Sequence, residues 1–442
     1  MMEPSTGYSW FERLPSGWDV APLRFMARFE SGGTPDKGNR EFWDGEIPWV
    51  SPKDMKVDRI GDSEDHVTDA ALAETSLSMV LAGSVLLVVR GMILAHSIPV
   101  AVTTAPVTIN QDMKALRCSE RIEARFLQAV IHGAKPWFLA NTGESSHGTK
   151  KLETEVIGRF LVPLPPLESQ RAIADFLDAE TARIDALIAA KENLLAILAE
   201  KRRALVTQAV TRGLDPSVTM RDSGIPWLGG IPAHWDEVRL RFLFKRIEQG
   251  WSPQAESHEP SEDEWGVLKL SAVSRGRFDE SAAKALPPEL EPRLDYEVKA
   301  GDFLLTRANT PSLVGDVCFV EATRPKLMLC DLIYRLALRP ELVDGRYLAH
   351  FLGLPLGRSQ IEADARGTSG SMVKISQEHI KSWLIPVPPL AEQLEIVEFV
   401  SDELNSIAKV ESATRSTLRL LRERREAVIA AAVTGQLDVE VA

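Results

Sequence analysis

One stretch of this 442-residue chain occurs twice, and this repeat limits the possible folds more than any other feature. Residues 163–215 begin PLPPLESQRAIADFLD, and residues 386–438 begin PVPPLAEQLEIVEFVS. When the copies are aligned at a constant offset without a gap, roughly four positions in ten are identical, which indicates an internal duplication. Whatever the first copy folds into, the second copy is expected to fold into as well.

Both copies have the apolar period of helices that pair along a seam. Apolar residues recur at alternating steps of four and three, which is the heptad pattern. A Pro-Pro pair precedes each predicted helix and Gly213 or Gly435 ends it, as expected at the start and stop of a helix. With about 44 residues between these signals, each helix extends roughly 65 Å at about 1.5 Å per residue. The predicted seam residues are Ile173, Leu177, Ile184, Leu187, Leu194, Leu198 and Leu205, then Ile396, Val400, Ile407, Val410, Leu421 and Val428.

Polar residues interrupt the predicted seam at the same places in both copies. They are Glu180, Lys191 and Lys201 in the first copy and Glu403, Thr414 and Arg424 in the second. Such residues reduce stability and can fix register or orientation. We expect antiparallel pairing, because the helices are separated by a long domain and antiparallel packing gives each half an equivalent partner. An ordinary buried helix hairpin is the alternative.

The duplication extends to the segments before each helix. Trp10 is followed by LPSGWDVAPLRF at Leu14–Phe25, and Trp227 is followed by IPAHWDEVRLRF at Ile231–Phe242. Further on, ESGGTP at residues 30–35 corresponds to EQGWSP at 248–253, AGSVLLVVRG at 82–91 to AGDFLLTRAN at 300–309, and INQDMKAL to MLCDLIYRL in pattern. Between these shared segments the halves diverge almost completely. Two domains of one fold that recognise different targets would show this alternation.

Within each half, helix and strand signals are mixed. Val85–Val89, Phe303–Thr306 and Val314–Val320 have the composition of strands, while Ile122–Ile131 and Tyr347–Phe351 look like short helices. The predicted fold class is α+β: two similar α/β domains joined by two long antiparallel helices, a coiled coil, with a pseudo-two-fold internal repeat. The predicted boundaries are 1–162 for the first domain, 163–215 for the central helix, 216–385 for the second domain and 386–442 for the C-terminal helix.

Composition excludes several classes of protein. The first twenty residues lack the basic and apolar regions of a signal peptide, and no uncharged apolar run of about 18 residues occurs, so we expect a cytoplasmic protein with no membrane segment. Cys118, Cys318 and Cys330 are too few and too widely spaced for a disulfide framework or a metal site. The net charge of −12 argues against indiscriminate coating of nucleic acid but permits a local basic cleft.

Catalytic motifs are absent or incomplete. Every Pro-Pro pair is followed by Leu or Glu, so no adenine-methylation motif with Pro-Pro-Tyr or Pro-Pro-Phe occurs. Gly143–Lys150 only superficially resembles a phosphate-binding loop, and Asp295–Lys299 lacks the upstream Pro-Asp of a nuclease site. Neither HExxH nor GxSxG is present. We therefore predict that the chain is not an enzyme by itself.

Loops at equivalent places in the two halves carry the residue types that contact DNA. Glycines allow a backbone to approach phosphate, and hydroxyl, amide and basic side chains can donate to phosphate or base edges. A solvated turn is the alternative for any one loop, but their paired recurrence favours binding. The candidates in the first half are Ser31, Gly32, Gly33, Thr34, Lys37, Arg40, Ser51, Lys53, Arg90, Ser145, Ser146, Lys150 and Lys151. Those in the second half are Gln249, Trp251, Ser252, Lys269, Ser271, Ser274, Arg275, Arg307, Asn309, Arg366, Thr368, Ser369 and Lys374.

These residues together carry a family resemblance. Each half opens with W…[LI]P..WD and closes with [VI]P[LV]PPL..Q..I..F[LV] before a long helix, and in this the whole chain resembles the specificity subunit of type I restriction-modification systems. The resemblance implies that the halves are target recognition domains, each reading one half of a split, asymmetric site in double-stranded DNA. It implies that the helices fix the unread spacer. Ser169 stands where the second copy has Glu392, which leaves the assignment unchanged.

The resemblance also implies partners. Two modification subunits, which bind S-adenosylmethionine and methylate adenine, are expected to dock on the helices, and restriction subunits that use ATP and Mg are expected to join them. This chain itself is expected to hold no cofactor and no metal. The alternative from a different class is a non-catalytic two-domain scaffold that binds proteins or ligands rather than DNA.

The helix lengths generate a testable prediction. If the paired helices set the distance between two readers, inserting one heptad into both 182–198 and 405–421 lengthens the unread spacer of the recognised site. Sequencing of DNA methylation in cells that express the variant measures the spacer directly. An unchanged spacer would contradict the role of the helices as a ruler.

Overall fold

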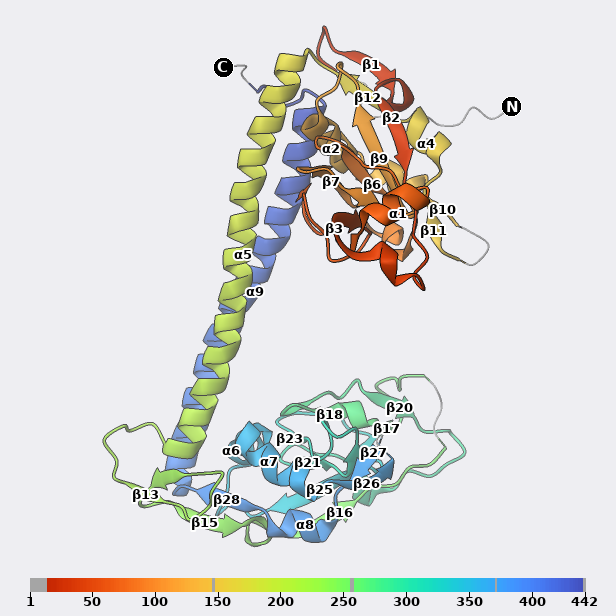
Figure 1. Cartoon of the computed structure of the whole chain (residues 1–442). Coiled ribbons are helices and arrows are strands. Elements are labelled where there is room, and N and C mark those ends of the chain that lie inside the picture. The colour runs from red at the N-terminus through yellow and green to blue at the C-terminus, as the bar shows by residue number, and fades with distance from the viewer. Residues whose placement is uncertain (1–13, 145–147, 255–257, 370–371, 440–442) are drawn as a thin grey trace. The chain divides into compact units, whose positions relative to one another are not determined.

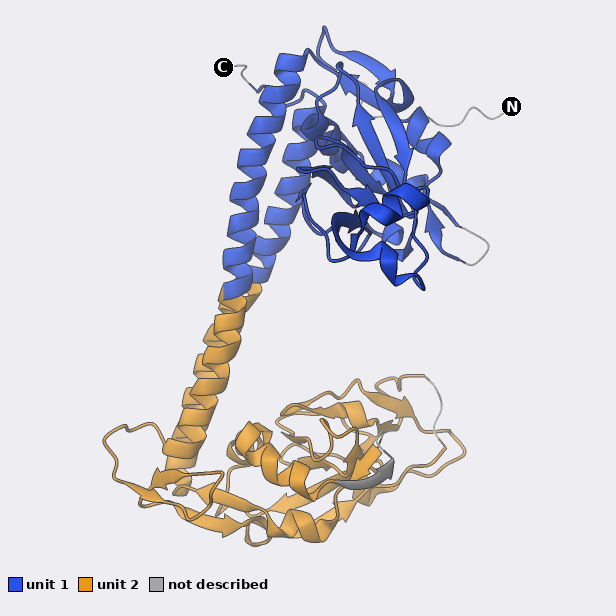
Figure 2. Cartoon of the chain, in the orientation of Figure 1, with its two compact units in different colours: residues 1–193, 414–442 blue, residues 194–413 orange. Residues whose placement is uncertain are grey.

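The computed structural model describes residues 14–144, 148–254, 258–369 and 372–439, without the side chains of residues 366–369 (Figure 1). Trp10 therefore lies outside the described residues. The chain divides into two compact units, residues 1–193 with 414–442 and residues 194–413 (Figure 2). Each unit contains one mixed α/β domain and a stretch of both long helices. Within the described residues, no helix combines the length and the apolar character needed to cross a membrane.

The domain of the first unit is built on a five-stranded sheet with the order β2-β9-β6-β7-β4. Its elements are β1 (Asp19–Pro22), η1 (Leu23–Phe25), β2 (Ala27–Ser31), η2 (Arg40–Phe42), β3 (Trp43–Val50), β4 (Arg59–Ile60), β5 (His66–Val67), α1 (Asp69–Glu74), β6 (Val85–Val88), η3 (Met92–Ala95), β7 (Val100–Thr103), β8 (Thr108–Ile109), β9 (Met113–Cys118), α2 (Ala124–Gly133), α3 (Lys135–Ala140), β10 (Gly143–Glu144), β11 (Lys150–Lys151), α4 (Thr154–Arg159) and β12 (Leu161–Leu164). The central strand β6 reads VLLV and is fully buried, because α2 packs against it and strands flank it on both sides. A second, smaller sheet has the order β5-β3-β8.

The domain of the second unit repeats this plan with the sheet order β16-β25-β21-β23. Its elements are β13 (Met220–Asp222), β14 (Gly230–Pro232), β15 (Asp236–Arg239), η4 (Leu240–Phe242), β16 (Phe244–Gln249), β17 (Gly266–Leu268), η5 (Leu270–Ala272), β18 (Val273–Ser274), β19 (Arg277–Phe278), β20 (Ala283–Ala285), η6 (Leu294–Tyr296), β21 (Phe303–Thr306), β22 (Ala308–Asn309), β23 (Val317–Phe319), β24 (Leu327–Met328), β25 (Ile333–Leu338), α6 (Gly345–Gly353), α7 (Pro355–Asp364), β26 (Arg366–Ser369), β27 (Met372–Lys374), α8 (Gln377–Ser382) and β28 (Leu384–Val387). A second sheet, β20-β17-β24, has its own buried cluster. The predicted α+β class with two similar domains is confirmed.

The two predicted long helices are present as α5 (Leu167–Arg212), of 46 residues, and α9 (Leu390–Val433), of 44 residues. Their ion pairs demonstrate antiparallel pairing. In the first unit Arg424 donates to Glu180 at 3.0 Å, and in the second unit Lys201 lies 3.9 Å from Glu403. These are the same two positions of the repeat with the copies exchanged, so the polar interruptions of the seam pair with one another. They fix the register that the apolar residues alone leave free.

The predicted seam is wrong at two equivalent positions. Leu187 and Val410 are 45% and 44% exposed, whereas Thr414 and Leu418 are buried. The physical reason is that the apolar residues of each helix cover a wider face than the residues that contact the partner helix. A leucine one position away from the contact line therefore also fits the heptad count. In α9 the buried side chains are those of Thr414 and Leu418.

A buried glutamine fixes the start of each long helix. The side chain of Gln170 accepts from the Glu123 N–H at 2.8 Å and donates to the carbonyls of Arg121 at 3.0 Å and Pro165 at 2.9 Å. Gln393 repeats all three bonds, with Asp344 N–H at 2.9 Å, Leu342 O at 3.0 Å and Pro388 O at 2.9 Å. Both glutamines are at most 1% exposed. The glutamine of the repeated PPL..Q segment therefore joins the start of its helix to the start of α2 or α6.

A tryptophan of each WD segment packs where a long helix ends. Gly213 and Gly435 adopt positive φ angles of 74° and 69°, as a helix stop requires. A Cβ on Gly213 would lie 3.4 Å from the Trp235 ring, and one on Gly435 would lie 3.2 Å from the Trp18 ring. The indole of Trp235 also donates to Glu392 at 3.1 Å. The serine in place of Glu392 in the first copy thus removes a carboxylate that the second half uses.

The glutamine contacts predict a loss of stability. Gln170→Ala leaves buried backbone groups without partners and is expected to lower the free energy of unfolding of the first unit by about 2–4 kcal/mol. Chemical unfolding and amide hydrogen exchange around Glu123 measure the effect. Glu168→Ala, an exposed substitution in the same helical turn, is the control and changes stability by at most about 0.5 kcal/mol. Equal unfolding curves for the two variants would contradict the assigned role.

His350 of α6 predicts a pH dependence in the second unit. Burial lowers the pKa of His350 to about 4 from 6.5, with Arg202 and Arg346 acting in the same direction and Asp344 against it. Between these values the unfolded chain binds a proton that the folded chain does not, so stability falls as pH decreases from 6.5 towards 4. At about pH 5 the wild type is expected to lose about 1–2 kcal/mol more than His350→Gln, relative to neutral pH. Parallel pH profiles of the two proteins would contradict this.

Candidate nucleic-acid interface

Strand register brings the candidate loops of the first unit together at one end of the sheets. Ser31 pairs with Lys114 at the end of β2, Val88 pairs with Met113 at the end of β6, and Val50 pairs with Ile109 at the end of β3. The loop after β2, the residues after β3, Arg90 and the turn at residues 110–112 therefore meet. We call this set of segments the first polar edge.

The second unit has the same arrangement. Gln249 at the end of β16 pairs with Tyr334, and Thr306 at the end of β21 pairs with Ile333. The loop after β16, the segment after β17, residues 307–309 and the turn at residues 329–332 meet there and form the second polar edge. Strand β27 joins it, because Lys374 pairs with Ala308. The two polar edges lie at equivalent ends of equivalent sheets.

The loop after β2 is held by its glycines and by Thr34. A Cβ on Gly32 would lie 2.1 Å from the Ile109 carbonyl oxygen, so only glycine allows this close crossing of two backbones. The Gly33 N–H donates to the same carbonyl at 3.0 Å, and the Thr34 hydroxyl bonds to Gln111. Gly32 therefore has a packing role, which accounts for it without a ligand.

The loop after β16 repeats these contacts with different residues. Gly250 crosses the Leu329 carbonyl, with 2.2 Å to a Cβ placed there. The Trp251 N–H donates to that carbonyl at 3.0 Å, and the Ser252 hydroxyl bonds to Asp331, whose N–H donates back at 3.0 Å. The scaffold of the loop is thus shared between the halves. What differs is the set of side chains on the loop, most of all the half-buried Trp251 in place of Gly33.

The basic candidates of the first unit fall into two groups. Lys37, Arg40 and Arg90 are exposed, and no carboxylate of the described residues pairs with them. The others are neutralised. Lys53 pairs with Asp65 at 2.9 Å and Glu64 at 3.3 Å, and its hydrogen bond to Asp65 raises its pKa. Lys150 pairs with Glu144, and Lys151 with Glu153 at 2.9 Å.

The polar candidates of the first unit are also unequal. Ser51 is 6% exposed and both its N–H and its hydroxyl donate to Asp54, at 2.8 and 2.9 Å. Ser31 is exposed and accepts from the Lys114 ammonium at 2.5 Å. Ser145 and Ser146 lie outside the described residues. Ser51 therefore has an internal role, while Ser31 is presented at the edge.

The second polar edge contains most of the candidates of its unit. The guanidinium of Arg307 lies 5.9 Å from the ring centroid of Tyr334, and Asn309 accepts from the Thr310 N–H at 2.8 Å. Arg275 is exposed at a positive φ of 48°, and its N–H donates to Asp316 at 2.9 Å. Burial raises the pKa of Asp316. Arg366, Thr368 and Ser369 form β26, whose side chains are not described, and the remaining candidates are Lys269 and Ser274, half-buried, and Ser271 and Lys374, exposed.

Sequence reasoning missed three residues at the edges. Lys114 and Gln111 contact the loop after β2 in the first unit, and Arg293 lies 4.3 Å over the Trp251 ring in the second. The correspondence of INQDMKAL with MLCDLIYRL already marked the first of these segments as part of the repeat. No sequence signal marked Arg293, because the segment around it has no counterpart in the first half.

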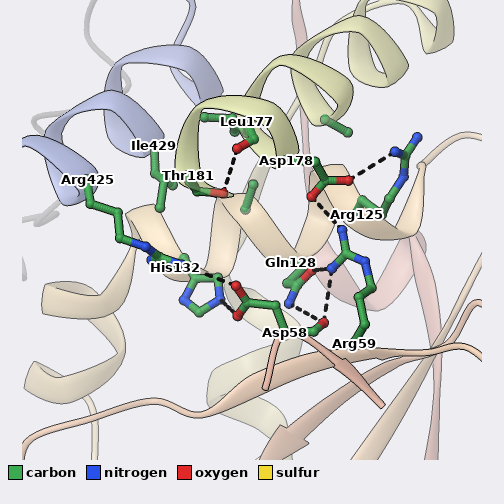
Figure 3. Close-up of a pocket in the computed structure, with 12 residues that line it drawn as sticks. Asp58, Arg59, Arg125, Gln128, His132, Leu177, Asp178, Thr181, Arg425 and Ile429 are labelled. Atoms are coloured by element: carbon green, nitrogen blue, oxygen red, sulfur yellow. Dashed lines mark hydrogen bonds and ion pairs between the residues drawn. The ribbon is translucent and has the colours of Figure 1, made fainter. Parts of the chain in front are cut away.

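A charged pocket of the first unit lies between the domain and both long helices (Figure 3). Asp58 contacts Arg425 of α9 at 3.2 Å and His132 of α2 at 3.4 Å, and Arg425 also donates to Asp185 of α5 at 2.9 Å. The pKa of Asp58 is lowered, and the contact with His132 is the largest cause that lowers it. These contacts attach the domain to the helices.

The other side of this pocket attaches to α5 alone. Arg59 donates to Asp178 at 2.6 Å, and Arg125 donates to Asp175 at 2.6 Å and to Asp178 at 3.1 Å. Every charged side chain here has a partner of opposite charge. Within the described residues no group of His, Cys, Asp and Glu side chains could hold a metal ion. We read the pocket as a structural junction.

Known proteins match both the sequence and the fold. Residues 15–196 match the family described as Type I restriction modification DNA specificity domain. The EcoEI type I specificity subunit of Escherichia coli is 33% identical over 224 residues, which is 50% of this chain and 37% of that protein. The MjaVIII specificity subunit of Methanocaldococcus jannaschii is 21% identical over 97% of this chain and 95% of its own length. The matched segments span 37% and 38% of the EcoEI and EcoR124I/EcoR124II subunits.

Two solved structures share the fold across nearly the whole chain. One, from work on complex assembly and conformational transition of the type I R-M system, has a TM-score of 0.64 at 16% identity and covers 96% of this chain and 100% of that one. The other, the HsdS subunit of Thermoanaerobacter tengcongensis, has a TM-score of 0.53 at 17% identity and covers 96% and 98%. In sequence and in its repeated PPL..Q segments the chain is similar to type I restriction-modification specificity subunits, and it shares the fold of the two solved structures.

Proposed function

We propose that this chain is the DNA-reading, non-catalytic subunit of a type I restriction-modification complex. In this proposal each domain reads one half of a bipartite, asymmetric site. One observation supports it above the others: two polar edges are built with the same backbone contacts at equivalent ends of two sheets, yet they present different exposed residues. A single binding task repeated on two different targets requires this combination. The scaffold alternative has no comparable support.

The shared contacts position each loop, and the private residues specify the bases. The Gly33 and Trp251 N–H groups make the same bond to a backbone carbonyl, so the loops have the same path. At the first edge Lys37, Arg40 and Arg90, which pair with no carboxylate of the described residues, are suited to phosphate or guanine contacts. At the second edge Trp251 and Arg293 offer a stacked aromatic and cation instead. Because the two polar edges present different side chains, each domain reads a different half-site in this proposal.

The long helices set the unread spacer and dock the partners in this proposal. The exchanged ion pairs, Glu180 with Arg424 and Lys201 with Glu403, hold the helices in one antiparallel register. A fixed register means a fixed helix length between the two readers. Two modification subunits, which would carry S-adenosylmethionine, and restriction subunits, which would carry ATP and Mg, complete the complex in the cytoplasm. The chain itself contributes recognition only.

The exposed cations of the first polar edge provide a matched test. Arg40→Ala with Arg90→Ala removes two charges from the edge, and Arg28→Ala with Arg117→Ala removes two charges from the opposite end of the same sheet, where these residues pair across strands. The first variant is expected to weaken specific DNA binding about 10–100-fold and to reduce the dependence of log K on log salt by up to about 2. Fluorescence anisotropy at several salt concentrations, with the assembled complex, measures both quantities.

The control variant decides the interpretation. It is expected to retain the affinity and the salt dependence of the wild type within about twofold. If both variants lose affinity equally, charge alone controls binding and the first polar edge has no special role. If neither does, the proposed reading surface is wrong.

A further inference from the structure

An exposed phenylalanine occurs at the same place in both halves, far from the polar edges. The three-residue turns η1 and η4 both read Leu-Arg-Phe, at 23–25 and 240–242, and we call them the LRF turns. Phe25 is 62% exposed and Phe242 is 53% exposed. The guanidinium of the preceding arginine lies 4.9 Å from the Phe25 ring centroid and 4.7 Å from that of Phe242. The chain thus presents the same aromatic and cation pair twice.

Each LRF turn is held rigidly by its leucine. Leu23 and Leu240 are fully buried, and their N–H groups donate to the carbonyls of Phe160 and Trp383, both at 2.8 Å. Each leucine carbonyl accepts from the residue after the turn at 2.9 Å. Helices α4 and α8 pack against the turns. The exposed arginine and phenylalanine are therefore presented in a fixed position, which reduces the entropy lost when a partner binds them.

Folding of the domains does not explain these side chains. A large exposed aromatic contributes little to the core, and aromatic and arginine side chains are enriched at protein–protein interfaces. The flanking residues differ between halves, Ala21 and Pro22 in one and Val238 and Arg239 in the other, although the Arg-Phe pair is the same. Among the described residues, no carboxylate pairs with Arg24 or Arg241. Both charges are left available to an external partner.

The position of the LRF turns argues against DNA as that partner. Strand β2 runs from Ala27, next to the turn, to Ser31 at the first polar edge, and β16 runs likewise from Phe244 to Gln249. At about 3.3 Å per residue, each turn lies roughly 15–20 Å from its polar edge, at the opposite end of the strand. DNA bound at the edge leaves the turn uncovered.

We propose that the two LRF turns are docking points for two copies of one protein, each presenting an apolar pocket rimmed by carboxylates. Equivalent surfaces on two repeated domains bind the same partner twice, which requires a partner present in two copies. A rigid aromatic with an adjacent arginine is typical of residues that dominate binding energy, and the arginine requires an acidic rim. Under the proposed function, on which this inference rests, the partner is the modification subunit.

Native mass spectrometry of the full chain with its cognate modification subunit tests the proposal. The wild type is expected to bind two copies. Phe25→Ala and Phe242→Ala are each expected to weaken one of the two binding events at least tenfold, so that complexes with a single copy accumulate, and the double variant is expected to lose both. Leu81→Ala removes a side chain that is 46% exposed in the first unit and is the control, with the stoichiometry of the wild type expected. Circular dichroism spectra that match the wild type establish that the variants are folded.

Each other outcome overturns a different claim. If the wild type binds two copies and the Phe variants do so with unchanged affinity, the LRF turns are not docking points, and the proposed function stands. If the chain self-associates through these residues, the partner is a second copy of the chain and the inference is wrong. If the wild type binds no modification subunit but still binds DNA, the LRF turns are not docking points for it, and the proposed assembly is wrong while the reading of DNA stands.

Discussion

A buried glutamine at the start of each long helix couples each sheet domain to the helix pair. The side-chain amides of Gln170 and Gln393 each bond three backbone groups. These are the carbonyl of the first proline of the Pro-Pro pair, a carbonyl just before α2 or α6, and the N–H of the residue that caps the N-terminus of α2 or α6. A neutral amide does this without the desolvation penalty of a buried charge. Because each sheet packs on α2 or α6, the orientation of the sheet follows from this contact. The polar edge at the end of the sheet is therefore oriented by a residue that is remote from it.

The repeat uses the same contacts twice and changes what lies between them. Four features recur in both units with similar distances. They are the buried glutamine, the LRF turn, the glycine that crosses a backbone carbonyl, and the tryptophan that packs at the end of a long helix. The junction with the helices does not recur. The first unit has the charged pocket around Asp58 and Asp178, whereas the second unit has Ser401 at the position of Asp178 and Leu404 at the position of Thr181. Two domains that read different targets on one chain can share a scaffold, but each needs its own contacts with the helices and its own side chains at the polar edge.

The sequence predicted the elements that repeat better than those that do not. The ends of α5 and α9 followed from Pro-Pro pairs and from Gly213 and Gly435, because these residues act locally. The seam assignment failed at Leu187 because apolar residues lie on both sides of the true seam, and only the partner helix decides between them. Equivalent loops indicated where the polar edges form. The ion pairs of Lys53 with Glu64 and Asp65 could not be predicted from the sequence. The folded path of the loop between β3 and β5 decides whether a carboxylate lies near the lysine.

The most direct test of two independent readers is long-read sequencing of DNA methylation in cells that express the chain with its modification subunit. The account predicts a bipartite motif with adenine methylation on both strands, absent when either protein is missing. Replacing residues 1–161 with the corresponding domain of a relative is predicted to change one half-site and to leave the other half-site and the spacer unchanged. A change in both half-sites, or a single continuous motif, would contradict the account.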